Sequence, residues 1–89
     1  MMRQYKKLLQ GLLVGWVKQY RVSNDITQEA MAEKLRISPR SYSDLEREIF
    51  CFSAVTLMFF LLILSKDEAV RLLEDFRILV DREDQNIVA

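Results

Sequence analysis

Apolar residues recur at intervals of three and four along most of this chain, which is the spacing of one face of an α-helix. The longest stripe consists of Tyr5, Leu8, Leu9, Leu12, Leu13, Trp16, Val17 and Tyr20. It predicts a helix over residues 2–20, and similar patterns predict helices over residues 27–35, 39–47, 53–64 and 66–82. Two glycines and one proline also favour helices with short connections over a turn-rich β fold. We therefore expect an all-α fold of five helices.

Residues that favour helix starts stand before several of these stretches. Thr27 precedes the second, and Ser38 with Pro39 opens the third. Serine and threonine accept hydrogen bonds from unpaired N–H groups of a first turn, and proline is tolerated at the first helical position. The remaining start signals are Ser53 for the fourth helix and, with the spacing of a capping box, Ser65 and Glu68 for the fifth.

The helices predicted over residues 27–35 and 39–47 are too short to be stable alone. They must pack on each other and on the rest of the chain, joined by a tight turn. Two short helices in this arrangement are typical of a DNA-reading helix-turn-helix.

The charge of the chain is balanced but unevenly distributed. The formal net charge is zero, yet residues 1–22 carry five basic and no acidic side chains. A neutral total does not favour DNA binding, because neutralisation of phosphates supplies most non-specific affinity. The basic first segment partly compensates for this if it faces the same way as the helix over residues 39–47.

Several classes of function find no support. The 89 residues suffice for one small domain, residues 1–89, and contain no histidine. No glycine-rich phosphate loop or nucleophile elbow is present, so we expect no enzyme, no metal site and no cofactor. The single cysteine, Cys51, excludes an intrachain disulfide and is expected to be a small buried residue in a cytoplasmic protein. The apolar run over residues 57–64 is shorter than the about 20 residues that span a bilayer, so no membrane association is expected.

Three segments together closely resemble one known family. They read TQE and MAEKL within residues 27–35, ISPRSYSDLER over residues 37–47, and SAVTL over residues 53–57. The chain resembles a short, stand-alone member of the Cro/C1-type helix-turn-helix regulators of bacteria, the xenobiotic-response-element type. The resemblance implies a compact five-helix bundle of the phage-repressor type, with the helix over residues 39–47 in the major groove of double-stranded DNA. It also implies homodimers that read half-sites about 34–36 Å apart.

The resemblance further implies which side chains contact DNA. Residues at the positions that reach base edges are Arg40, Ser43 and Asp44, while phosphate contacts fall to Gln28, Ser38, Ser41 and Arg47. An arginine can pair bidentately with guanine, and an aspartate can accept from cytosine N4. Asp44 is as well placed to pair with Arg40 or Arg47 on its own helix.

The chain departs from the family at positions important for DNA binding. Arg36 and Glu48 stand where the family usually has glycine, and a left-handed backbone costs more for any other residue. The loop over residues 48–52 is also unusually apolar, where a DNA-facing rim would be polar.

Two functions follow from this sequence. The segment over residues 57–64 is apolar all round, which one small bundle cannot cover, so we expect a homodimer interface that includes Phe59, Leu62 and Phe76. The first function is that of a sequence-specific, DNA-binding transcriptional regulator acting as this homodimer. The alternative is a protein-interaction module with the helix-turn-helix fold, a protein partner and little DNA affinity.

Overall fold

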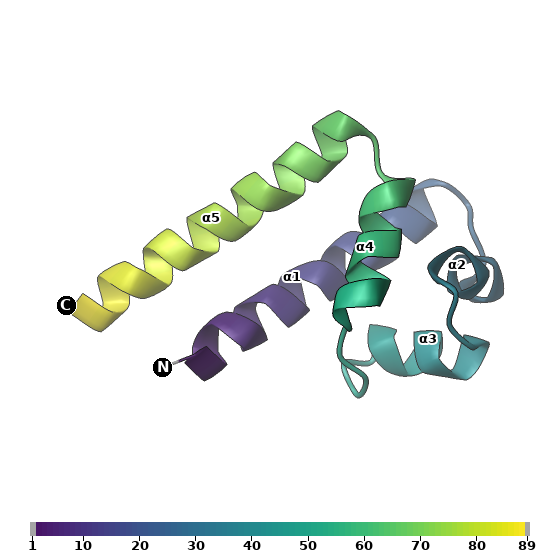
Figure 1. Ribbon diagram of the computed structural model, residues 1–89, viewed down its shortest axis with the longest axis horizontal. Coiled ribbons are helices and arrows are strands. Elements are labelled where there is room, and N and C mark those ends of the chain that lie inside the picture. The colour runs from purple at the N-terminus through teal and green to yellow at the C-terminus, as the bar shows by residue number, and fades with distance from the viewer. Residues whose placement is uncertain (1, 89) are drawn as a thin grey trace.

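The computed structural model describes residues 2–88 and confirms the all-α architecture for that part of the chain. Its five helices are α1 (Met2–Ser23), α2 (Gln28–Leu35), α3 (Pro39–Glu46), α4 (Ala54–Ile63) and α5 (Lys66–Val88). Figure 1 shows α2, α3 and α4 gathered around the second half of α1, while α5 runs back along α1 toward the N-terminus. The helix-turn-helix is therefore one end of an elongated molecule that measures 44 × 28 × 20 Å.

The predicted helix starts are confirmed at atomic detail. The Thr27 hydroxyl accepts from the Ala30 N–H at 3.1 Å, and the Ser38 hydroxyl accepts from the Ser41 N–H at 3.0 Å. Ser53 opens α4 in the same way. At α5 the capping box is reciprocal: the Ser65 N–H donates to Glu68 Oε1 at 2.8 Å, and the Glu68 N–H donates to Ser65 Oγ at 3.1 Å.

Two helices are longer than their local patterns predict. Helix α1 continues past residue 20 to Ser23. Asp25, just after its end, has a left-handed backbone (φ 55°), and the Ile26 N–H donates back to the Arg21 carbonyl at 2.9 Å. Helix α5 continues past residue 82 to Val88. Packing along α1 accounts for this, because the Tyr5 hydroxyl donates to Asp84 across the two helices.

The core lies between α1 and the three short helices. Its largest fully buried side chains are Leu13, Val17, Met31, Leu35, Tyr42, Leu45 and Phe60. The rings of Tyr20 and Phe60 meet edge to face, 6.1 Å apart, and so join α1 to α4. In the described part of α5 the only buried apolar side chain is Leu72. The core that α1 shares with α2, α3 and α4 thus positions the helix-turn-helix.

Cys51 is exposed, contrary to the expectation of a buried side chain. The neighbouring residue, Phe52, occupies the inward position of the loop instead, and its N–H donates to Gln10 Oε1 at 2.8 Å. None of the helices within residues 2–88 has both the length and the apolar character that crossing a bilayer requires.

Candidate nucleic-acid interface

The turn between α2 and α3 keeps a left-handed residue although that residue is not glycine. Arg36 has φ 60° and ψ 39°, its N–H donates to the Glu33 carbonyl at 3.1 Å, and the Ile37 N–H donates to the Ala32 carbonyl at 3.0 Å. These bonds are the Schellman arrangement that glycine usually completes. The Arg36 guanidinium donates to the Lys34 carbonyl and lies 4.6 Å from the centre of the Phe59 ring. These contacts of its side chain offset part of the backbone cost.

The end of α3 has the same geometry at Glu48. This residue has φ 61°, its N–H donates to the Leu45 carbonyl at 3.1 Å, and the Ile49 N–H donates to the Asp44 carbonyl at 2.8 Å. Both positions at which the resemblance leads us to expect glycine therefore keep the backbone conformation that glycine favours. The helix-turn-helix therefore keeps its usual backbone conformation at these two positions, and only the side chains differ from the glycines of the family.

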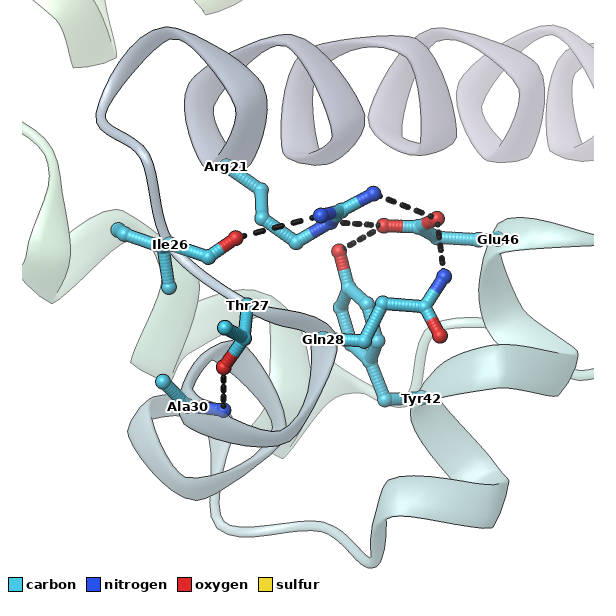
Figure 2. Close-up of polar contacts among 7 residues, drawn as sticks. All are labelled: Arg21, Ile26, Thr27, Gln28, Ala30, Tyr42 and Glu46. Carbon is cyan, nitrogen blue, oxygen red and sulfur yellow. Dashed lines mark hydrogen bonds and ion pairs between the residues drawn. The ribbon is translucent and has the colours of Figure 1, made fainter.

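A buried carboxylate ties α1, α2 and α3 together (Figure 2). Glu46, 8% exposed near the end of α3, accepts from Arg21 Nε at 2.7 Å and Arg21 Nη2 at 3.3 Å. It also accepts from Gln28 Nε2 at 3.1 Å and from the Tyr42 hydroxyl. Arg21 additionally donates to the Ile26 carbonyl at 3.2 Å. We call Arg21, Gln28, Tyr42 and Glu46 the Glu46 network.

The Glu46 network keeps its carboxylate ionised. Burial alone would raise the pKa of Glu46, but hydrogen bonds from Arg21 and Tyr42 and the charge of Arg21 outweigh it and hold that pKa below its ordinary value. Burial, with the hydrogen bond to Glu46, raises the pKa of Tyr42 above its ordinary value. The network therefore joins a charged pair and a neutral phenol, and it links α3 to α1 and to the start of α2.

Gln28 stands in the first turn of α2, where the resemblance implies a phosphate contact. Its side chain is exposed, but Nε2 is engaged by Glu46. The structure thus gives Gln28 a defined orientation through the Glu46 network. This partner lies far along the chain, and no local signal in the sequence pointed to it.

The outward face of α3 carries the residues expected to reach bases. Arg40, Ser43, Asp44 and Arg47 follow the spacing of one helix face, whereas Tyr42 and Leu45 are buried. Arg40 is exposed, and its guanidinium takes part in none of the hydrogen bonds or ion pairs found among residues 2–88.

Asp44 and Arg47 are joined to each other. Arg47 Nη2 lies 2.8 Å from Asp44 Oδ1, which realises one of the two pairings that the sequence left open. Ser38 and Ser41 are likewise joined, because the Ser38 hydroxyl donates to Ser41 Oγ at 2.9 Å while capping α3. The outward face of α3 therefore presents one cation without an ionic partner, Arg40, beside an internally neutral pair.

The basic first segment of the chain lines a cleft together with the loop that follows α3. A cleft of about 430 Å³ is lined from α1 by Arg3, Lys6, Lys7, Gln10 and Val14, and from the loop after α3 by Glu48, Phe50 and Cys51. The structure thus brings the basic side chains of α1 beside the loop that follows α3, and not onto the outward face of α3 itself.

A separate apolar face is exposed on α4. Val55, Met58 and Leu62 lie on one side of the helix, Leu62 with 75% of its surface exposed, and they line a groove with Ala54 and Phe59. Two of the expected interface residues, Phe59 and Leu62, thus share this groove. The third, Phe76, is half-buried on α5 and does not line it.

Comparison with known protein families assigns the fold. A family model described as helix-turn-helix, of the Cro/C1 type, matches residues 17–61, just over half of the chain. The chain belongs to this helix-turn-helix family. The match begins in the second half of α1 and ends within α4, so it contains the Glu46 network and every residue of α3.

Both ends of this helix-turn-helix protein lie outside the matched region. Residues 2–16 of α1 and all of α5 are not covered by the family model. No curated protein and no solved structure matched the chain. The family is one of DNA-binding regulators.

Proposed function

We propose that this helix-turn-helix protein is a sequence-specific, DNA-binding transcriptional regulator that places α3 in the major groove. The observation that carries the proposal is the outward face of α3. Arg40 is exposed there without an ionic partner, on a helix whose start is capped by Ser38 and whose end is held by the Glu46 network. A rigid helix with one free guanidinium is suited to bidentate recognition of guanine.

The other residues of the face take supporting roles in this proposal. Ser43 and Asp44 stand within reach of base edges, and Asp44 would exchange its bond with Arg47 for one with cytosine N4. The proposed phosphate contacts are those of Gln28, Ser38, Ser41 and Arg47. Contacts of this kind set the register of the protein on the duplex without reading its sequence.

The regulator acts as a homodimer in this proposal, with the apolar groove on α4 as the centre of the interface. Helix α4 has no charged residue between Ala54 and Ile63, so a second copy would meet no charge that must be desolvated. One eight-residue reading helix contacts few bases, and a two-fold dimer presents two of them to a palindromic site. A bacterial, cytoplasmic regulator of the xenobiotic-response-element type fits these features.

The test is fluorescence anisotropy of the full chain with labelled duplexes from the region upstream of its gene and with scrambled duplexes of equal length. Arg40→Ala should weaken binding to the preferred duplex by about 1–3 kcal/mol and reduce its advantage over the scrambled duplex. Arg77→Ala, which removes an exposed arginine from α5, is the matched control and should bind as the wild type does. Equal affinities for all three proteins would argue against base reading by α3.

A second candidate function rests on the loop over residues 48–52. Ile49 is 67% exposed and Phe50 is also exposed, directly after α3, where a DNA-binding surface is usually polar. These residues favour a protein-interaction module with a helix-turn-helix fold and little DNA affinity. Absence of binding to every duplex, even at low salt, would favour this function over DNA recognition.

A further inference from the structure

The cleft beside the end of α3 collects positive charge from the first turns of α1. Arg3, Lys6 and Lys7 occupy positions i, i+3 and i+4, so their side chains leave the same side of the helix. All three are exposed and line the cleft, where Glu48 is the one acidic residue. None of them takes part in the ion pairs found within residues 2–88.

The position of this cleft relative to α3 is fixed by contacts on both sides. Gln10 of α1 accepts the Phe52 N–H at 2.8 Å, and the Phe52 ring is buried at a centroid distance of 6.5 Å from the ring of Phe60. The start of the loop is held to α3 by two backbone hydrogen bonds, which the N–H groups of Glu48 and Ile49 donate to carbonyls of α3. Figure 1 shows the first turns of α1, the loop and α3 along the lower edge of the molecule.

The charge on this edge is divided unequally between the two helices. On α3, Asp44 neutralises Arg47 and leaves Arg40 as the free cation. On α1, three cations face one acid across the cleft. Most of the positive charge without an ionic partner near the end of α3 therefore comes from α1.

We propose that Arg3, Lys6 and Lys7 form a second phosphate-binding surface, which binds the DNA backbone beside the point where α3 enters the major groove. This inference rests on the proposed DNA-binding function and adds a contact region to it. The family match begins at residue 17, so these three residues lie outside the matched region. They supply the electrostatic attraction that a chain of zero net charge otherwise lacks.

The test compares two triple variants that change the net charge equally, from 0 to −3. The cleft variant is Arg3→Gln, Lys6→Gln and Lys7→Gln. The control variant is Lys18→Gln, Lys66→Gln and Arg77→Gln, which removes three exposed cations that do not line the cleft. Affinity for a random-sequence duplex is measured by anisotropy across a salt series, because non-specific binding needs no knowledge of the operator.

The cleft variant should show a shallower dependence of log affinity on log salt concentration, by up to about 2.7 for three lost phosphate contacts at about 0.9 each. The control variant should keep the wild-type slope. Preference for the upstream duplex over the random one should be unchanged, since phosphate contacts carry no sequence information. A gain-of-charge variant, Glu48→Lys, should steepen the slope.

The outcomes separate this inference from the function on which it rests. Equal slopes for the cleft and control variants, with normal wild-type binding, would overturn the phosphate-binding surface and leave the DNA-binding function standing. A wild-type protein that binds no duplex at low salt would overturn both. Circular dichroism melting of both variants checks that the exposed substitutions leave the fold intact.

Discussion

At the residue scale, the most consequential side chain is Glu46. A buried carboxylate is costly unless every oxygen has partners, and here Arg21, Gln28 and Tyr42 supply them. Within residues 2–88, no buried side-chain nitrogen or oxygen is left without a hydrogen bond. Because its partners come from three helices, this one residue couples the orientation of α3 to α1 and to the start of α2.

Glu46→Gln should lower the free energy of unfolding by about 3 kcal/mol at neutral pH, because it leaves the Arg21 charge without its counter-charge. The pKa of Glu46 is depressed in the folded state, so its contribution to stability is present above the unfolded value of about 4.3 and is lost as the pH falls through the folded value. The wild type and Glu46→Gln should therefore converge in acid.

Urea unfolding followed by circular dichroism at several pH values and one protein concentration measures this convergence. Glu33→Gln, at an exposed site on α2, is the control and should follow the wild type at every pH. A constant gap between the wild type and Glu46→Gln from neutral to acid pH would show that ionisation of Glu46 does not contribute to stability.

At the element scale, both helices of the helix-turn-helix end on left-handed residues that are not glycine. Arg36 has compensating side-chain contacts with Lys34 and Phe59, whereas the Glu48 side chain makes no hydrogen bond or ion pair within residues 2–88. The two helix ends therefore have the same backbone conformation, but only at Arg36 do side-chain contacts offset part of its energetic cost. Helices α2 and α3 tolerate arginine and glutamate at these positions because the backbone hydrogen bonds at both helix ends are retained.

Glu48→Gly should stabilise the fold by about 1 kcal/mol, because relief of a left-handed backbone, roughly 1–2 kcal/mol, exceeds the added entropy of the unfolded chain, about 0.4–1 kcal/mol. Arg36→Gly should gain less, since it loses the contacts with Lys34 and Phe59. Thermal unfolding measures both variants. Glu48→Gln removes the same charge without relieving the backbone, and a gain equal to that of Glu48→Gly would assign the effect to charge.

At the scale of the whole molecule, the described residues form two structurally distinct ends. The helix-turn-helix occupies one end, and α1 and α5 extend from it as an antiparallel pair (Figure 1). A hydrogen bond of 2.9 Å from Trp16 Nε1 to Asp75 Oδ2 joins the two long helices midway. The apolar groove on α4 lies outside this pair and outside the core, which leaves it free for the proposed second copy.

Leu62→Lys should make the protein monomeric, because it places a charge in the apolar groove proposed as the dimer centre. Light scattering coupled to gel filtration measures the mass, and the same variant should bind a two-half-site duplex more weakly than the wild type. Val22→Lys, at an exposed apolar residue near the end of α1, is the control and should remain dimeric. A wild-type protein that stays monomeric at high micromolar concentration would refute the dimer.

The sequence by itself determined the five helices, their starting points and the pairing of α2 with α3. Apolar spacing and capping residues act over three or four positions, so they can be read without knowledge of the fold. Thr27, Ser38 and Ser53 cap the helices that their positions predicted. The resemblance over the middle of the chain then indicated which face of α3 is expected to contact DNA. Arg40 and its neighbours on that face follow the spacing of a single helix, so this expectation needed no tertiary contact.

Only the tertiary structure decided which distant residues meet. It extended α5 alongside α1, exposed Cys51, directed Gln28 onto Glu46 and brought Lys6 beside the loop after α3. Each of these outcomes depends on contacts between residues far apart in the chain, and no local pattern encodes them. The elements follow from short-range backbone and side-chain preferences, whereas the arrangement of charge around α3 follows from how those elements pack.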